Sequence, residues 1–555
     1  MKSITLSADI LIIGGGAAGC YAALSAARHR VGRVVLVEKA HIERSGCLAA
    51  GVNALNAYIG RGHTPEDYVE YARKDAEGLI RPDLVLSMAR RLNEVVGNLE
   101  KLGLTILKDS EGHYAERGWR NIKINGENLK PLLAAAVRAE PAVTVLNHVN
   151  VVSYLSDGER VAGAVGFGVR EPIQYVLKAP AVICATGGAA GIYRPNNPGS
   201  ARQAMWYCPF NSGSGYAQGI RAGAEMTTLE MRFVALRCKD TIAPTGTLAQ
   251  GAGARQVNRL GEIYEERYGF TTSGRIYGVR QEELAGRGPS RLRAENLSPG
   301  QIEDLYKAYL NMAPTQTLSW VEQGEDISSL SVEIEGTEPY IIGGHTAGGY
   351  WVDTRRETTL RGLFAAGDVA GGCPQKYVSG AMAEAEIALE AALDGAELRP
   401  ELDSPEPARC LAEAEKFLGR PAALFTTGEL AEALQKTMDE QAGGRGAGYS
   451  YQEAGLNQAE ARLDELEDLS LGLAAANMPE LMKIQELRDR LTVARSLVAH
   501  LKARRETRWP GFGLHLDYPR KEDTWLRYVN SRLKEGRVEI IFRDMVRGDK
   551  YEHQY

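Results

Sequence analysis

Short apolar runs separated by an alanine-rich segment mark the start of the chain. Residues 10–13 and 34–37 are wholly apolar, which is typical of strands buried in a parallel sheet. Residues 20–30 between them are rich in alanine and favour a helix. This order of strand, helix and strand predicts a βαβ unit at the beginning of the fold.

Helical periodicity dominates the other end of the chain. After Pro400, apolar residues recur at i, i+3, i+4 and i+7 in long amphipathic segments, which predicts a helical bundle. The glycine-rich stretch at 442–448 could cradle a phosphate, but it follows a helix rather than a strand, so we interpret it as a linker. The predicted helices cover residues 405–418, 428–441, 452–467 and 479–505.

A charged and glycine-rich region interrupts the strand pattern in the middle of the chain. It covers residues 232–337 and includes a polar helix near 298–312. We therefore expect a nucleotide-binding domain made of residues 1–231 and 338–399, an inserted capping domain at 232–337, and a C-terminal helical domain at 400–555.

A glycine motif follows the first apolar run. Gly14, Gly16 and Gly19 have GxGxxG spacing: the first permits a tight turn, the second lets the backbone approach a pyrophosphate, and the third allows close helix–strand packing. Glu38 lies about 20 residues beyond the loop, where a carboxylate can accept hydrogen bonds from a ribose diol. The motif alone is weak, but strand, loop, helix, strand and acid in this order predict a dinucleotide site.

Four later segments indicate which dinucleotide is bound. Residues 44–51 are small enough to run against a flat ring, and residues 181–188 and 363–372 are apolar runs that end in glycine turns. Residues 379–386 open a helix whose N-terminus could face the N1–C2=O edge of a flavin. A simple NAD enzyme needs only the first βαβ unit, so a long site to which later segments of the chain also contribute suits FAD better than NAD. The predicted cofactor-binding residues are Gly14, Gly16, Ala17, Ala18, Gly19, Glu38, Lys39, Ser45, Gly46, Cys47, Ala50, Gly51, Ala185, Thr186, Gly187, Gly367, Asp368, Ser379 and Ala381.

The composition agrees with a soluble enzyme, and if this enzyme transfers electrons, they must come from another subunit. The net charge of −6 implies neither a polyanion nor a membrane surface as a partner, and no apolar run approaches the roughly 18 residues of a membrane span. Seven cysteines lack CxxC or CxxxC spacing, so neither a metal nor an iron–sulfur cluster is predicted on this chain. Sparse cysteines and the absence of a leader segment predict a cytoplasmic location.

Distinctive stretches are spread over nearly the whole length, among them Tyr-Ile-Ile-Gly-Gly-His at 340–345. The others are residues 53–60, 64–69, 124–131, 162–167, 222–226, 232–240, 506–512 and 525–530. In these stretches the sequence resembles the flavoprotein family of succinate dehydrogenase, fumarate reductase and L-aspartate oxidase. Within that family it most closely resembles the alpha subunits of dissimilatory adenylylsulfate (APS) reductases, although it is shorter than expected of them.

This resemblance implies a fold, an activity and a partner. The fold class is an α/β Rossmann-like FAD-binding domain with an inserted α+β capping domain and a C-terminal helical domain. The activity is that of an FAD-dependent oxidoreductase that converts APS and two electrons into sulfite and AMP, or the reverse, through a flavin N5–sulfite adduct. The partner is a ferredoxin-like beta subunit with [4Fe–4S] clusters, which forms a heterodimer with this chain and exchanges electrons with it.

The resemblance also assigns active-site residues. It puts His345 and Arg237 in contact with substrate, where a guanidinium can grip sulfate or carboxylate oxygens through two hydrogen bonds. It puts Asn56 near the reactive face of the flavin and Glu127 in the active-site region, with Arg280 as a weaker candidate. The residue types alone leave simpler roles open: a histidine bonded to loop carbonyls, arginines in surface ion pairs, a turn asparagine and a solvated glutamate.

Two positions separate the chain from the succinate and fumarate enzymes. Gly46 stands where succinate dehydrogenases carry the histidine that binds FAD covalently, so the resemblance implies noncovalent FAD. Lys376 lies in the segment where the dicarboxylate enzymes carry an arginine that donates a proton and anchors the substrate. Because lysine is a poor replacement for a bidentate clamp, this difference counts against dicarboxylate chemistry.

One segment also departs from the APS reductases. Residues 245–254 are small and polar, and Gln250 replaces a leucine expected near the flavin, so we expect a reshaped adenosine pocket. Two alternatives therefore remain open. The same fold could reduce another unsaturated or organosulfur anion, or the chain could be a noncatalytic flavin subunit that relays electrons.

Overall fold

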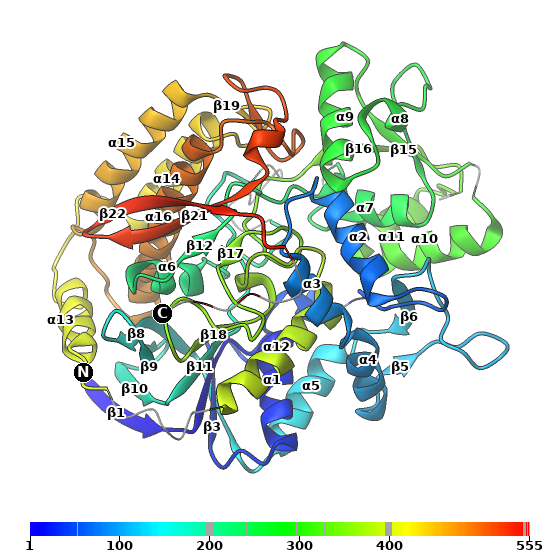
Figure 1. Ribbon diagram of the computed structural model, residues 1–555. Helices are drawn as coiled ribbons and strands as arrows, with labels where there is room; N and C mark the ends of the chain where they lie inside the picture. The colour runs from blue at the N-terminus through cyan, green and yellow to red at the C-terminus, as the bar shows by residue number, and fades with distance from the viewer. Residues whose placement is uncertain are drawn as a thin grey trace.

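A five-stranded parallel sheet forms the centre of the computed structural model, which describes residues 1–50, 52, 54–195, 205–239, 241–295, 297–326, 328–394, 402–547, 551 and 553. All residues of the first four strands in the order below are buried, as expected for a parallel sheet covered on both faces. The order is β18 (Leu363–Ala365), β11 (Ala181–Cys184), β2 (Ile10–Ile13), β3 (Val34–Glu38) and β7 (Val143–Asn147) (Figure 1).

The predicted βαβ unit is confirmed in the middle of this sheet. Helix α1 (Ala17–Arg28) joins β2 to β3, which pair in parallel with Ile10 opposite Val34. Helix α1 packs against α12 (Tyr377–Leu393) and α5 (Leu129–Ala139). Sheet and helices therefore share one apolar core, and the carboxyl ends of β2, β11 and β18 meet at one edge.

Two further sheets and several helices surround the central sheet. One sheet has the order β1 (Lys2–Ser7), β10 (Ile173–Lys178), β9 (Val161–Gly168) and β8 (Val149–Ser156), and contacts β11 through β9. The other is small, with the order β4 (Ala54–Asn56), β6 (Asn121–Asn125) and β5 (Thr105–Ile106). The helices in this part are α2 (Pro65–Asp75), α3 (Pro82–Ala89), α4 (Leu92–Lys101) and α6 (Ser214–Arg221).

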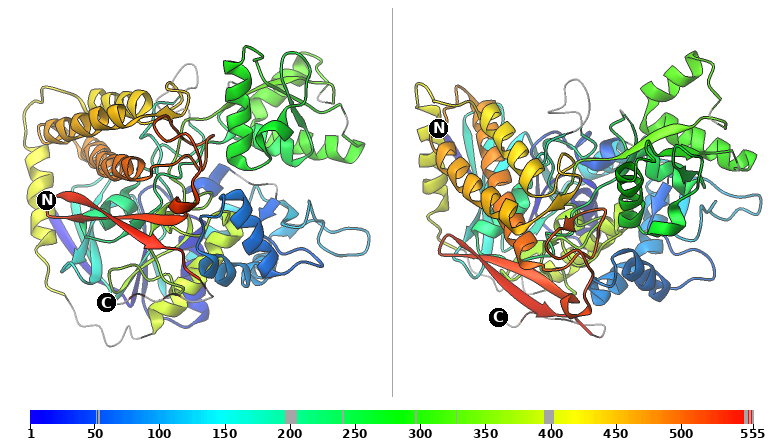
Figure 2. Two further views of the ribbon diagram at one scale, coloured as in Figure 1. Left: turned by 45° about the horizontal axis from the view of Figure 1, so that its top comes forward. Right: turned by 90° about the horizontal axis from the view of Figure 1, so that it is seen from above.

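The inserted region from 232 to 337 forms a separate lobe, which we call the cap. Figure 2 shows it in green at one end of the molecule, away from the C-terminal helices. Its sheet has the order β13 (Leu236–Cys238), β16 (Val332–Gly336), β15 (Arg291–Arg293) and β14 (Arg255–Val257). Its helices are α7 (Thr245–Gly251), α8 (Glu265–Tyr268), α9 (Thr272–Leu284), α10 (Pro299–Met312) and α11 (Pro314–Glu322).

The C-terminal region begins with the predicted helices and ends in a hairpin that was not predicted. The helices are α13 (Glu406–Leu418), α14 (Thr427–Gln441), α15 (Glu453–Ser470) and α16 (Met478–Ala503), each within three residues of the expected bounds. The hairpin consists of β21 (Arg527–Lys534) and β22 (Arg537–Asp544), and the short strands β19 (Ser450–Tyr451) and β20 (Leu514–His515) pair with each other.

The hairpin connects the C-terminal region back to the FAD-binding part of the chain. It extends a sheet with the order β17 (Gly349–Tyr350), β12 (Met226–Thr227), β21 and β22. The predicted fold class is confirmed, with the addition of this shared sheet. The domain boundaries stay a prediction, and the one at residue 400 lies outside the described residues. Among the described helices, none is both long and apolar enough to cross a membrane.

Candidate active site

A cavity of about 340 Å³ opens at the carboxyl edge of the central sheet and continues under the cap. One wall comes from the β2–α1 loop and from the ends of β3, β11 and β18. The opposite wall includes Pro244, Thr247 and Leu248 at the start of α7 and Met312 at the end of α10. The cavity therefore joins the predicted dinucleotide site to the predicted substrate side.

The three glycines of the loop differ in what they permit. Gly14 has φ +103°, and a Cβ there would lie 2.4 Å from the carbonyl oxygen of Ala185. A Cβ on Gly19 would lie 1.8 Å from the carbonyl oxygen of Gly14, so helix and strand pack as closely as predicted. Gly16 lines the cavity, and no side chain caps the N-terminus of α1 behind it. The loop thus offers free backbone N–H groups to an anion.

Two buried charges fix this loop from behind. The carboxylate of Glu38 accepts from the N–H groups of Gly15 and Ala40, each at 2.7 Å. The ammonium group of Lys130 donates to the carbonyl oxygen of Gly15 at 2.5 Å. Glu38 also lines the cavity, so its position suits a hydrogen bond to a ribose diol. The role of Lys130 was not predicted, because its position in the sequence says nothing of its contact with Gly15.

Most of the predicted cofactor-binding residues meet in this one cavity. Gly19, Ser45 and Ser379 lie outside its described lining, and the Ser379 hydroxyl is buried without a hydrogen-bond partner among the described residues. Gly51 lies outside the described residues, as does the side chain of Ala50. The predicted residues that line the cavity are Gly14, Gly16, Ala17, Ala18, Glu38, Lys39, Gly46, Cys47, Ala185, Thr186, Gly187, Gly367, Asp368 and Ala381.

These residues fit an FAD molecule. The uncapped end of α1 suits a pyrophosphate, the Glu38 carboxylate suits a ribose, and the N-terminal turn of α12 lines the cavity with Tyr377 and Val378. Asp368 accepts a hydrogen bond from Tyr207 Oη at 2.7 Å, and burial raises the pKa of its carboxyl. Lys39 is less available than expected, because its ammonium group lies 2.6 Å from Glu486 and donates to the carbonyl of Phe210.

His345 lies in an aromatic box beneath the cap. Its ring stacks on Phe233 with centroids 4.3 Å apart and planes inclined by 20°, and it meets Trp206 and Tyr377 edge-on at 5.5 and 5.2 Å. All four residues line the cavity. Desolvation lowers the pKa of His345 to about 4, so the imidazole is neutral at pH 7. The three aromatic rings were not predicted, because they come from widely separated parts of the chain.

Asn56 and Glu127 have different surroundings. Asn56 ends strand β4 and lines the cavity, as its predicted position near the flavin requires. Glu127 is exposed in the turn before α5 and does not belong to the described lining. Arg280 is also outside that lining and lies 3.4 Å from Glu283. The structure therefore brings Asn56 together with His345, but not Glu127 or Arg280.

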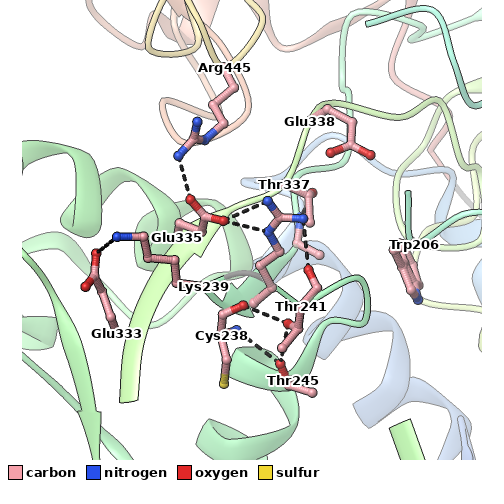
Figure 3. A network of polar contacts seen from close by, with 12 residues as sticks. Trp206, Cys238, Lys239, Thr241, Thr245, Glu333, Glu335, Thr337, Glu338 and Arg445 are labelled. Carbon is pink, nitrogen blue, oxygen red and sulfur yellow. Dashed lines mark hydrogen bonds and ion pairs between the residues drawn. The ribbon is translucent and has the colours of Figure 1, made fainter. Parts of the chain in front are cut away.

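Arg237 is buried in the cap beside the cavity rather than in its described lining. Its Nε and Nη2 lie 3.0 and 2.7 Å from Glu335 Oε1, and its Nη1 donates to the carbonyl of Thr241 at 3.0 Å. Arg445 Nη2 donates to the other carboxylate oxygen, Glu335 Oε2, at 2.5 Å, and Figure 3 shows Arg445 reaching Glu335 from a separate segment. Contact of Arg237 with a substrate therefore requires it to exchange one of these partners, and its predicted role stays a prediction.

Lys376 and Gln250, the two residues that differ from those expected in related enzymes, do not belong to the described lining of the cavity. Lys376 is fully buried and donates to the carbonyl oxygens of Gly367 and Ala370, both at 2.7 Å. The amide of Gln250 donates to Glu265 at 3.1 Å, and Gln250 is absent from the described lining. The wall that α7 contributes is therefore made by Thr247 and Leu248 rather than by Gln250.

Comparison with known proteins identifies the family. Residues 9–287 match the FAD binding domain family. The alpha subunit of adenylylsulfate reductase from Megalodesulfovibrio gigas is 30% identical over 97% of this chain and 95% of its own length. The structure of adenylylsulfate reductase from Archaeoglobus fulgidus superposes with a TM-score of 0.92 at 34% identity, covering 100% of this chain and 98% of that one.

A structure of adenosine-5-phosphosulfate reductase in complex with sulfite, as a covalent adduct, matches equally well, with a TM-score of 0.92, 34% identity and coverage of 100% and 98% of the two chains. The geometry of the cavity and these similarities agree on the cofactor and on the class of reaction. The chain belongs to the adenylylsulfate reductase alpha-subunit family of FAD-dependent oxidoreductases.

Proposed function

We propose that this chain is a catalytic alpha-type subunit that converts APS and two electrons into sulfite and AMP, or carries out the reverse reaction. The observation that supports this most is the continuity of one cavity from the phosphate loop at Gly16 to His345 under the cap. The full-length similarity to APS reductases supports the choice of substrate.

The cofactor would be held by the chain without a covalent bond. The loop from Gly14 to Gly19 would bind the pyrophosphate, Glu38 would bind the adenosine ribose, and the N-terminus of α12 would place the positive end of its dipole toward the flavin. When bound, FAD supplies the two electrons that reduce the sulfur atom and break its bond to the bridging oxygen of AMP.

The residues on the substrate side orient the sulfonyl group and exclude water. Because His345 is neutral, its ring can donate one N–H to a sulfonyl oxygen without carrying a charge into the aromatic box. The Asn56 amide adds a second donor from the β4 side of the cavity. Arg237 supplies the positive charge if it exchanges Glu335 or Thr241 for the substrate, and Glu127 has no role in this proposal.

The hydrogen bonds of the Lys376 ammonium group argue against a reaction on dicarboxylates. Its ammonium group is used by two backbone carbonyls and by a carboxylate within the FAD-binding domain. It is therefore unable to act as a proton donor or substrate clamp in the cavity. The alternative substrate is a small anion other than APS, and the experiment below distinguishes between the two.

Electrons would reach the FAD from an iron–sulfur partner. The described residues contain no group of three or more side chains suited to hold a metal ion, and the seven cysteines are unpaired thiols. From the similarity to alpha subunits of adenylylsulfate reductase, we propose a ferredoxin-like beta subunit with [4Fe–4S] clusters as the partner, and we also propose the cytoplasm as the location.

The proposal is tested with the purified FAD-loaded protein. Sulfite should bleach the main visible flavin band reversibly, and sulfite with AMP should reduce ferricyanide, with two equivalents consumed for each APS formed. In a second assay the flavin is first reduced, and its reoxidation is followed after addition of APS, fumarate or a sulfonate. A protein that ignores sulfite and APS but oxidises its flavin with fumarate would show that the substrate is wrong while the family stands.

A further inference from the structure

Arg117 belongs to the cavity lining and forms no ion pair with the residues that the structure describes. Arg117 lies in the segment between β5 and β6, is partly buried, and belongs to the cavity lining. Within the described part of the chain, no carboxylate lies within ion-pair distance of it. Its only electrostatic neighbour there is Asp304 of α10.

Asp304 is already neutralised by another residue. Both of its carboxylate oxygens bind the ammonium group of Lys123, at 2.8 and 3.1 Å. The cluster of Arg117, Lys123 and Asp304 therefore carries a net charge of about +1 at the wall of the cavity, by simple Coulomb counting. Burial lowers the pKa of Arg117, which means that its cation is desolvated in this position.

The other charged groups of the cavity are already satisfied. Lys39 is paired with Glu486, Glu38 accepts from two backbone N–H groups, and Asp368 accepts from Tyr207. Arg117 is thus the single cavity-lining cation without a charged partner among the residues that the structure describes. A guanidinium group can bind a phosphate through two parallel hydrogen bonds.

The position of Arg117 relates it to the substrate rather than to the loop of the dinucleotide. Its backbone N–H donates to the carbonyl of Asn121 at 3.0 Å, and Asn121 pairs directly with Asn56 between β6 and β4. The cap contributes apolar groups to the same cavity, Leu248 from α7 and Met312 from α10. One cation beside an apolar wall suits the phosphate and the base of a nucleoside monophosphate.

We propose that Arg117 binds the phosphate of the nucleotide part of the substrate and thereby selects nucleotide anions over small organic acids. This inference rests on the proposed function, because it requires AMP to be a ligand of the cavity.

The test compares AMP with adenosine, which differ only in the phosphate. Binding of each to the FAD-loaded protein is measured by titration calorimetry for the wild type, Arg117→Gln and Arg61→Gln. Arg61 is a matched control, because it is exposed, pairs with Asp109 at 3.2 Å and lies outside the cavity lining. Arg117→Gln should weaken AMP about 10- to 100-fold, as expected for a lost charge-assisted bidentate contact. Adenosine should change less than about twofold, because it makes no such contact, and Arg61→Gln should leave both affinities as in the wild type.

Each other outcome contradicts the inference. Equal loss of AMP and adenosine would mean that Arg117 only shapes the cavity, and unchanged AMP affinity would mean that the phosphate binds elsewhere. If Arg117→Gln does not load FAD, Arg117→Lys decides: it keeps the charge but loses the bidentate geometry, so AMP should weaken about 3- to 10-fold, and wild-type affinity for AMP would contradict the proposal. A wild type that bleaches with sulfite but does not bind AMP would overturn this inference alone, whereas one that responds to neither would overturn the proposed function as well.

Discussion

Lys376 Nζ lies 2.8 Å from Glu384 Oε2, and both side chains are completely buried in the FAD-binding domain. Arg356 holds the other carboxylate oxygen of Glu384 at 3.2 Å. The pair therefore belongs to a charge cluster that joins the start of α12 to the turn after β18. Its contribution is to the fold around the cofactor rather than to the substrate side.

We expect Lys376→Met to lower the free energy of unfolding by about 3–5 kcal/mol, because removing one partner leaves a buried charge incompletely paired. Thermal denaturation monitored by circular dichroism measures this loss. Lys307→Met is the control, since Lys307 is 60% exposed and pairs with Glu303 on the surface, where the cost should be below about 1 kcal/mol. Lys376→Arg should not gain fumarate reduction, and a clear gain would contradict the structural role.

The FAD should be released intact when the protein is denatured. Gly46 has φ +78°, and a Cβ there would lie 3.0 Å from Gly16 Cα, so the position favours glycine over a side chain that could bind the flavin. After acid precipitation we expect a colourless pellet and yellow FAD in the supernatant, measured by absorbance and fluorescence. Flavin that stays with the pellet would refute a noncovalent cofactor.

Glu38→Ala should weaken FAD binding by about 1.5–3 kcal/mol, because a charge-assisted hydrogen bond to the ribose is lost. The dissociation constant is measured by adding FAD to apoprotein and following flavin fluorescence. Glu43→Ala is the control, since Glu43 pairs with Arg138 at 2.5 Å near the surface and does not line the cavity. Equal FAD affinity in both variants would remove Glu38 from the cofactor site.

Arg237→Ala should weaken sulfite binding by about 2–4 kcal/mol if the guanidinium reaches the substrate anion. Spectral titration of the flavin band measures the sulfite affinity, and the flavin-to-protein ratio reports whether the cofactor site is intact. Glu335→Gln separates the alternatives, because it keeps Arg237 but weakens the ion pair that now holds it. If both variants lower only the melting temperature and leave sulfite affinity unchanged, Arg237 stabilises the cap and does not touch substrate.

The low pKa of His345 predicts a pH-dependent loss of stability. Its folded-state pKa of about 4 lies below the ordinary histidine value of 6.5, so the unfolded chain binds the proton more tightly. His345 therefore leaves the free energy of unfolding unchanged above about pH 6.5 and lowers it progressively as the pH falls to about 4. The loss should be no more than about 3 kcal/mol, because the ring lines the open cavity.

His345→Asn should flatten this part of the stability curve, measured as melting temperature between pH 7 and pH 4 in the apoprotein. His113→Asn is the control, because His113 is 49% exposed and close to two carboxylates rather than desolvated. A wild-type curve that His345→Asn leaves unchanged would show that the imidazole is not held neutral by burial.

Local signals in the sequence predicted the parts of the fold that depend on local structure. The βαβ unit, the four C-terminal helices and most of the cofactor-binding loop follow from periodicity and from glycine positions. The hairpin of β21 and β22 was missed although it is local, with Glu535 and Gly536 between Lys534 and Arg537. Its pairing with β12 was beyond local signals, because it joins Met226 to Ser531 across 305 positions of sequence.

The substrate side was harder to predict for the same reason. Arg237 could be singled out by resemblance, but its partner Glu335 lies 98 residues further along the chain and is visible only in the structure. Trp206, Phe233 and Tyr377 form one aromatic box with His345 although each lies in a different segment. Arg117 carries no sequence signal, because what distinguishes it is that its side chain forms no ion pair with the described residues.

The chain enters and leaves the cap at one paired crossing of its backbone. Phe233 and Tyr340 exchange two backbone hydrogen bonds, of 2.8 and 2.9 Å, so the chain enters and leaves the cap through adjacent strands. Because both covalent connections of the cap meet here, no strand of the flavin-binding sheet lies within the cap, although ion pairs such as Lys123–Asp304 and Arg445–Glu335 also tie the cap to the rest of the chain. The cap therefore supplies one wall of the cavity, with Leu248 and Met312, while the phosphate loop is held by a sheet that contains no cap strand.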